Sequence, residues 1–150
     1  MAVRRLMLED VRGFDESLGP GGLFPACEDN DIAWRGLVHG WWIAENADVA
    51  VRHDGFRSLE QLREHGIRDF YGIGGTLAKY LKSGHFRVAA MFIPLLCRFG
   101  VVDPARELLN RRVPRGLRRP YMLVRGLVDG LRTPLDRTTM CYRADAVSDV

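Results

Sequence analysis

The chain contains almost no lysine, few cysteines and no recognisable secretory signal. Two of its 22 basic residues are lysine, so the other 20 are arginine. Its three cysteines, Cys27, Cys97 and Cys141, are odd in number, far apart and outside any zinc-binding spacing. This pattern argues against a disulfide framework and a structural zinc site, and it favours a reducing compartment. The first eight residues hold two arginines with no apolar run behind them, so we expect a cytoplasmic protein.

Positive charge is concentrated in the C-terminal part of the chain. Residues 1–85 contain 10 basic and 13 acidic residues, whereas residues 86–150 contain 12 arginines and 6 acidic residues. We therefore divide the chain into a body, residues 1–85, and a basic tail, residues 86–150. Either the tail meets an anionic partner, such as a membrane surface or a nucleic acid, or its excess of arginine reflects only a general use of that residue.

Breaker residues and apolar spacing predict a helix-rich α/β fragment with two short strands. A hydrophobic content of 47% over 150 residues is enough for one domain with a core. A glycine and proline run at residues 19–22 excludes regular structure there, and the acidic residues that follow favour a helix start. The predicted helices are residues 3–11, 28–39, 58–82 and a last one that begins near Pro120; the predicted strands are residues 41–44 and 49–51. We expect Gly72, Gly74 and Gly75 to interrupt the third helix.

The basic tail combines an apolar stretch with a helix flanked by arginines. Residues 88–102 carry one charge, on Arg98, but they number only 15 and include Pro94. A helix that spans a bilayer needs ~20 residues, so we expect a buried or interfacial helix here. The last helix has an apolar side surrounded by arginines, and that side comprises Tyr121, Val124, Leu127, Val128 and Leu131. Such a helix suits the surface of an anionic membrane.

Residues 13–35 join a glycine-rich loop to a run of acidic residues. Glycines such as Gly21 and Gly22 let a ligand approach the backbone closely. Glu28 and Asp29 come directly after this loop. A carboxylate in that position can accept a proton from an incoming hydroxyl group, while its neighbour positions the acceptor or holds the loop.

The same segment also allows purely structural roles. Asp29 or Asn30 can cap the helix, and Asp31 and Arg35 can form an ordinary surface pair at positions i and i+4. For any one of these residues alone the structural role is the better interpretation. The ordered combination favours a functional site.

Three tryptophans follow the acidic run, and aromatic rings can stack on a sugar or fill a core. Trp34 lies on the helix side that we expect to be buried. If residues 41–44 form a strand, Trp41 and Trp42 must point to opposite faces. The one that faces solvent is then the better candidate for contact with an acceptor.

The ordered combination resembles family-two glycosyltransferases of the GT-A fold. In that family a Gly-Phe-Asp-Glu segment precedes a glycine-containing loop, a Glu-Asp-x-Asp helix start with a following arginine, and a glycine and an aromatic residue that lead into a strand. The matching residues are Gly13, Phe14, Asp15, Glu16, Gly21, Gly22, Glu28, Asp29, Asp31, Arg35, Gly40 and Trp41. The similarity continues through residues 48–53, a strand ending in histidine, and residues 70–75, and it covers roughly residues 3–81. Cys27 departs from the glycine or threonine that is usual there.

The resemblance implies transfer of a sugar from a nucleotide-sugar donor to a hydroxyl group of a glycan or lipid-linked acceptor. It makes Asp29 the catalytic base and Glu28 its support or an acceptor contact. His53 would help to bind a divalent metal such as Mg²⁺ or Mn²⁺, although a hydrogen-bonded structural role is the alternative. The expected substrate contacts are Gly21, Gly22, Asp31, Arg35, Trp41 and Trp42.

This resemblance covers only the acceptor side of such an enzyme. The nucleotide-binding half of the family, with its Asp-x-Asp metal motif, lies upstream of the matching segment. By position, the run from Asp29 to Asp31 matches the acceptor-side motif instead. We therefore expect a partial or split enzyme whose N-terminal half is supplied elsewhere.

Three functions are consistent with these patterns. The first is a bacterial glycosyltransferase of the cell envelope, acting in the cytoplasm or at the cytoplasmic face of the membrane. The second is a non-enzymatic basic module that binds anionic lipid; its arginine cluster is Arg111, Arg112, Arg115, Arg118 and Arg119. No nucleic acid is expected, because this cluster lacks interleaved aromatic residues. The third is a helical domain that resembles the family by chance.

Overall fold

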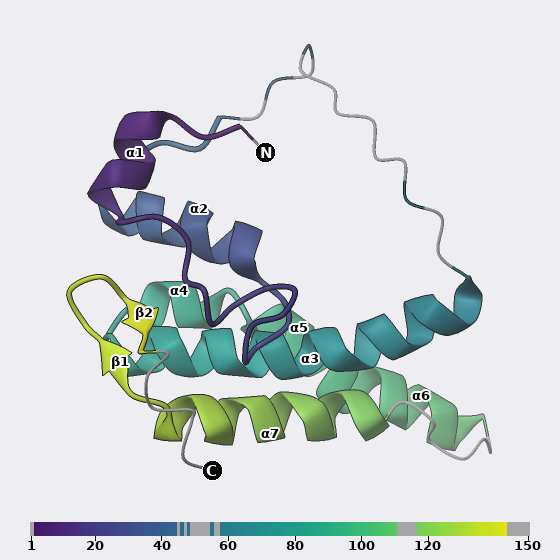
Figure 1. Cartoon of the computed structure of the whole chain (residues 1–150). Helices are drawn as coiled ribbons and strands as arrows, with labels where there is room; N and C mark the ends of the chain where they lie inside the picture. Colours follow the sequence, from purple (N-terminus) through teal and green to yellow (C-terminus); the bar gives the residue numbers. More distant parts are fainter. Residues whose placement is uncertain are drawn as a thin grey trace.

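The computed structural model describes residues 2–44, 46, 48, 55, 58–110 and 117–143, except for the side chains of residues 59–64. Within this part the chain is rich in helix and has two short antiparallel strands, as expected for an α/β fragment (Figure 1). The elements in chain order are α1 (Arg5–Asp10), α2 (Glu28–Val38), α3 (Leu59–Lys82), α4 (Phe86–Ala90), α5 (Ile93–Cys97), the π-helical turn η1 (Arg98–Val102), α6 (Asp103–Leu109), α7 (Arg118–Arg132), β1 (Leu135–Asp136) and β2 (Cys141–Tyr142).

Helices α3 and α7 lie side by side and run in the same direction, because the chain returns through α4, α5, η1 and α6 (Figure 1). Their backbones approach at glycines. A Cβ atom on Gly74 would lie 2.1 Å from the carbonyl oxygen of Leu123, and one on Gly126 would lie 2.0 Å from that of Tyr71. The helix α3 is continuous through Gly72, Gly74 and Gly75, so the predicted interruption is wrong. These glycines are where neighbouring segments pack against the helix.

A hydrogen bond reinforces this pair of helices. The hydroxyl group of Tyr71 donates to Oδ2 of Asp129 on α7 at 3.0 Å. Partial burial and this carboxylate raise the pKa of Tyr71 to about 12. The tyrosine therefore stays a neutral donor at physiological pH and holds the two helices in register.

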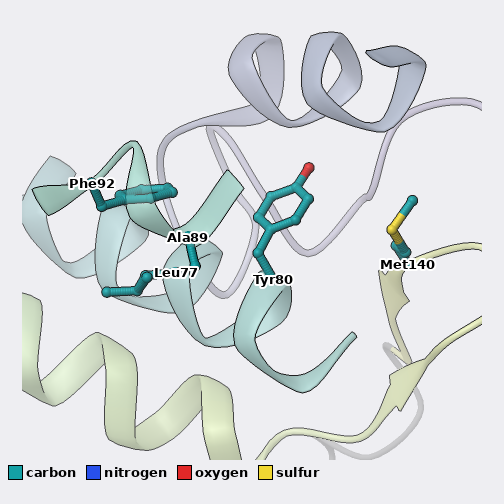
Figure 2. Close-up of a cluster of buried hydrophobic side chains, with 5 residues drawn as sticks. All are labelled: Leu77, Tyr80, Ala89, Phe92 and Met140. Atoms are coloured by element: carbon teal, nitrogen blue, oxygen red, sulfur yellow. The ribbon is translucent and has the colours of Figure 1, made fainter. Parts of the chain in front are cut away.

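The main hydrophobic cluster lies between the end of α3, helix α4 and the strand hairpin. Figure 2 shows its buried side chains, which are Leu77, Tyr80, Ala89, Phe92 and Met140. Trp34 from α2 packs against them, with its ring centroid 5.7 Å from that of Tyr80 and 5.1 Å from that of Phe92, both edge to face. The predicted burial of this side of α2 is thus confirmed, and α2 is attached to the body through it.

The two strands lie elsewhere than the sequence predicted. Residues 41–44 form no strand, and residues 49–51 lie outside the described part of the chain. The strands are instead β1 and β2, where Leu135 pairs with Tyr142. Between them the Asp136 carboxylate accepts a hydrogen bond from the Thr138 amide at 2.8 Å. A hairpin that an Asp side chain closes in this way can form without alternating apolar residues in its strands. Residues 135–142 therefore carry only a weak strand signal.

The apolar stretch of the tail is longer than its sequence suggested. Helical turns continue over 24 residues from Phe86 to Leu109; the most apolar 18-residue window of this stretch has a mean hydropathy of 1.6, and 22% of that window is buried. By length and composition alone it is the one helix in the described part of the chain that would suffice to cross a membrane. The helical stretch is thus longer than the 15 residues of the sequence estimate, and the expectation of a buried or interfacial helix stays a prediction.

Candidate functional site

The loop before α2 has a fixed shape built on glycines and a carboxylate. Oδ1 of Asp15 accepts a hydrogen bond from the amide of Ser17 at 3.0 Å, and Leu18 forms a β-bridge with Phe24. Gly19 and Gly21 have φ angles of +85° and +89°, which other L-residues adopt only with strain. The sequence pattern therefore encodes one loop conformation.

The loop packs against helix α3. The ring of Phe24 is fully buried, and its centroid lies 5.5 Å from that of Tyr71 and 5.0 Å from that of Tyr142. A Cβ atom on Gly75 would lie 2.2 Å from the ring of Phe24, and one on Gly72 would lie 2.7 Å from the amide nitrogen of Ala26. The loop therefore packs directly on the backbone of α3 at these two glycines.

A buried cluster of charged groups joins the loop to α2 and α3. Nζ of Lys79 lies 2.8 Å from Oδ2 of Asp15 and 2.8 Å from Oδ1 of Asp31. Nε of Arg35 lies 2.8 Å from Oδ2 of Asp31, and the hydroxyl group of Tyr80 donates to Oδ1 of Asp31 at 2.9 Å. Two cations face two carboxylates, so the cluster is balanced in charge and fully hydrogen bonded, as a buried ionic group requires. Desolvation, together with the neighbouring Asp31 carboxylate, raises the pKa of Tyr80 far above its usual range.

Arg35 also forms hydrogen bonds with the segment that follows helix α1. Its Nη1 donates to the carbonyl oxygen of Val11 at 2.8 Å, and its Nη2 donates to that of Gly13 at 2.7 Å. Asp31 and Arg35 are both 0% exposed. The pair at i and i+4 is therefore present, but it is buried rather than at the surface. In this structure these two expected substrate contacts support the loop and face no solvent.

The acidic residues in the first turn of α2 differ in their burial and in their contacts. Asp31 is sealed in the cluster, whereas Asp29 is exposed and Glu28 is half-buried with its side chain against Gly19. Among the residues that the structure describes, neither Glu28 nor Asp29 has a hydrogen bond or an ion pair. No side chain caps the helix, so the capping role considered for Asp29 is not observed. The fold leaves two carboxylates available beside the glycine loop.

The residue before this turn is a buried thiol. Cys27 has a φ of +74°, a conformation that glycine adopts with less strain than other residues. Burial raises the pKa of the Cys27 thiol to about 11, although a hydrogen bond with Thr76 lowers it. Because the thiolate is the reactive form, Cys27 is not a nucleophile at neutral pH.

The tryptophans divide into anchored and free side chains. Nε1 of Trp41 donates to Oδ2 of Asp10 at 2.8 Å, and its ring packs against the cluster of Met7, Val11 and Ile32. Trp42 is 94% exposed. Although no strand forms here, Trp42 is the one of the two that can contact a ligand. Gly21 is also exposed, whereas Gly22 lies against the backbone of Ser17.

The described residues gather no metal-binding site. They contain no group of three or more His, Cys, Asp or Glu side chains placed to hold an ion. His53, the expected metal ligand, lies outside them. Nδ1 of His39 lies 3.6 Å from Oδ2 of Asp10, which is a surface contact rather than part of a donor set. These residues do not fit a metal, and no step of the chemistry below involves one.

Sequence reasoning missed the groups that hold the site together. Asp15 was matched to the family motif without a role, and Lys79 and Tyr142 were assigned none. The amide of Tyr142 donates to Oδ2 of Asp15 across 127 positions of sequence, and no local pattern indicates such a contact. One available signal was Lys79 itself, a cation preceded by nine residues of helix that carry no charge.

No family model matches the chain, and comparison with curated proteins and with solved structures also finds no match.

Proposed function

We propose that this chain forms the acceptor side of a nucleotide-sugar-dependent glycosyltransferase of the GT-A type. The observation that carries the proposal is the contrast within the first turn of α2. Asp31 is fixed in a buried ionic cluster, while the side chains of Glu28 and Asp29, at the end of the glycine loop, have no ion pair with any residue that the structure describes. The exposed carboxylate of Asp29 is thus carried by a supported helical turn beside a glycine loop, where it can meet a hydroxyl group of a ligand.

In the proposed reaction Asp29 is the general base. The oxygen of the acceptor hydroxyl group attacks the anomeric carbon of the sugar, and the bond from that carbon to the nucleotide diphosphate breaks. Asp29 accepts the hydroxyl proton, and the electron pair of the broken bond leaves with the diphosphate. Glu28 orients the acceptor. The exposed ring of Trp42 follows the opposite end of α2, about 15 Å along the helix from Asp29, so only an extended acceptor reaches both.

The rigid support explains why this position suits a base. A general base is effective only within hydrogen-bond reach of the proton that it takes, so its backbone must be held. Here the buried Asp31–Arg35 and Asp31–Lys79 pairs fix the same helical turn that carries Asp29. Donor binding is assigned to an N-terminal half outside this segment, either in the same polypeptide or in a second chain.

The proposal is tested by replacing Asp29 in the natural protein produced from its own genomic context. Transfer of radiolabelled sugar from UDP-glucose, GDP-mannose or dTDP-rhamnose to cell-envelope lipid and glycan is measured. Asp29→Asn keeps the size of the side chain but removes its basicity, so we expect a loss of transfer on the order of a hundredfold to ten-thousandfold.

The matched control is Glu9→Gln, which makes the same exchange of acid for amide at an exposed position of α1. We expect it to retain transfer, because its partner Arg5 is also exposed and such a pair contributes little. Circular dichroism confirms that both variants are folded. Full transfer by the Asp29→Asn protein would remove Asp29 from the role of base.

A further inference from the structure

The outward side of α7 carries a row of exposed apolar side chains. The helix buries Leu123, Gly126 and Gly130, and its other side faces solvent. The exposed residues form what we call the outer stripe: Leu117, Tyr121, Val124, Val128 and Leu131, each between 36% and 63% exposed. At 100° per residue they fall within an arc of about 80°. An apolar row of this length on a helix that is already packed on its other side indicates an interaction surface.

A row of arginines borders the outer stripe. Arg118, Arg125 and Arg132 are exposed and follow one another at intervals of seven residues, so they lie on a line along the helix, next to the stripe. Within this row, Arg125 also contacts its own molecule, because its guanidinium group lies over the ring of Tyr71 and its Nε lies 3.8 Å from Oδ2 of Asp129. Arg119 lies outside the row, with its guanidinium group over the rings of Phe70 and Phe99. Four arginines and one aspartate give α7 a strongly positive outer surface.

We propose that the outer stripe and the arginine row dock α7 on an anionic membrane surface. An amphipathic helix lies in the interface with its apolar side toward the acyl chains, while cations at its edge meet lipid phosphates. Tyrosine suits this depth, because its ring is apolar and its hydroxyl group is polar. The inference is independent of the proposed sugar transfer.

The surroundings of α7 add to this surface. The turn η1 contacts α7 and belongs to the apolar stretch Phe86–Leu109, of which little is buried. Val101 and Val102 of that turn are 65% and 40% exposed. The segment that leads into α7 adds Arg111, Arg112 and Arg115 to the sequence. Among the described residues, exposed apolar surface therefore continues from α7 onto the turn η1.

Charge separates this partner from the two others that an apolar helix surface can meet. A second copy of the chain would bring two arginine rows close together with few acidic groups on α7 to compensate them, which is unfavourable. A nucleic acid would leave the aliphatic part of the stripe uncovered, because such partners need aromatic rings between the cations. An anionic lipid surface satisfies both the stripe and the row.

The test measures binding of the full chain to vesicles of phosphatidylcholine alone or mixed with phosphatidylglycerol, by flotation. We expect binding to the mixed vesicles only, weakened by salt. The triple variant Arg118→Gln, Arg125→Gln, Arg132→Gln should bind on the order of a hundredfold more weakly. Its control removes three exposed arginines elsewhere, by Arg4→Gln, Arg12→Gln and Arg137→Gln, and should stay within a few-fold of the parent.

A second variant tests the outer stripe itself. Val124→Ser with Val128→Ser removes exposed apolar groups, so binding should fall while the helix content in circular dichroism is kept. Equal loss in the control triple, or no preference for anionic vesicles, would overturn the proposal. A dimer in light scattering that the serine variant dissociates would assign the surface to a second copy instead. Asp29→Asn should leave vesicle binding unchanged, so this proposal and that of sugar transfer fail separately.

Discussion

At the scale of single residues, Lys79 is the cation that joins three segments of the chain. Its Nζ lies between the carboxylates of Asp15 in the loop and Asp31 in α2, and it belongs to α3. A buried ion pair often contributes little relative to an apolar alternative, but removal of one partner leaves the other charge uncompensated. The local geometry of the loop and of the α2 start therefore depends on this one ammonium group.

We predict that Lys79→Met lowers the free energy of unfolding by about 3–5 kcal/mol, since it leaves two carboxylates in a dry site with Arg35 alone. Urea unfolding monitored by tryptophan fluorescence measures the change. The other lysine is the control: Lys82 donates to the carbonyl oxygens of Gly130 and Thr133 at the end of α7. Lys82→Met should cost only about 1–2 kcal/mol. Similar losses in the two variants would contradict the importance of the buried cluster.

At the scale of elements, the contact between α3 and α7 depends on glycine. Both helices expose bare backbone to each other at Gly74 and Gly126, and the resulting closeness lets Tyr71 reach Asp129. Read only along the chain, these glycines indicate helix breaks, because glycine is a poor helix former. Packing of the neighbouring helix outweighs that local preference, which is why the third predicted helix proved continuous.

Gly126→Ala should therefore destabilise the protein by about 1–3 kcal/mol or more, because the new methyl group meets the Tyr71 carbonyl and forces the helices apart. Gly66→Ala is the control within α3. Its Cβ would come no nearer than 3.8 Å to Nη2 of Arg119, so the higher helix propensity of alanine should stabilise the fold by roughly 0.5–1 kcal/mol. Thermal unfolding of the two proteins should shift in opposite directions. A neutral Gly126→Ala would show that the helices are not in backbone contact in solution.

At the scale of the whole molecule, the sequence was sufficient for the starts of the main helices and insufficient for the strands and for the assembly of the elements. The starts of α2, α3 and α7 and the breaks between them follow from acidic, glycine and proline residues that act over a few positions. The sequence predicted that one of Trp41 and Trp42 faces solvent but not which one, and it argued this from a strand that does not form. The pairing of Asp15 with Lys79 and Tyr142, by contrast, joins residues 64 and 127 positions apart. The strand hairpin owes its position to the same long-range contacts rather than to an alternating pattern.

The same contacts bear on how the body and the basic tail depend on each other. The body's α3 is covered along its length by the tail's α7, and Tyr142 reaches back to donate to the carbonyl oxygen of Gly75 at 2.7 Å. Phe92 and Met140, both from the tail, complete the cluster around Tyr80 (Figure 2). A body without its tail would expose the apolar side of α3 and lose the buried tail side chains Ala89, Phe92, Leu123, Met140 and Tyr142.

We therefore predict that residues 1–85 alone lack cooperative thermal unfolding and a near-ultraviolet dichroism signal. A domain is stable by only about 5–15 kcal/mol, and each large core side chain removed contributes about 1.5–3 kcal/mol of burial. The burial energy that the fragment loses therefore exceeds the stability of a typical domain. Addition of a separately produced fragment of residues 86–150 should restore both signals, because the missing surface is supplied in trans. A cooperative transition in residues 1–85 by themselves would mean that the glycine loop and the start of α2 need no support from the tail, and the rigid positioning of Asp29 would then require another cause.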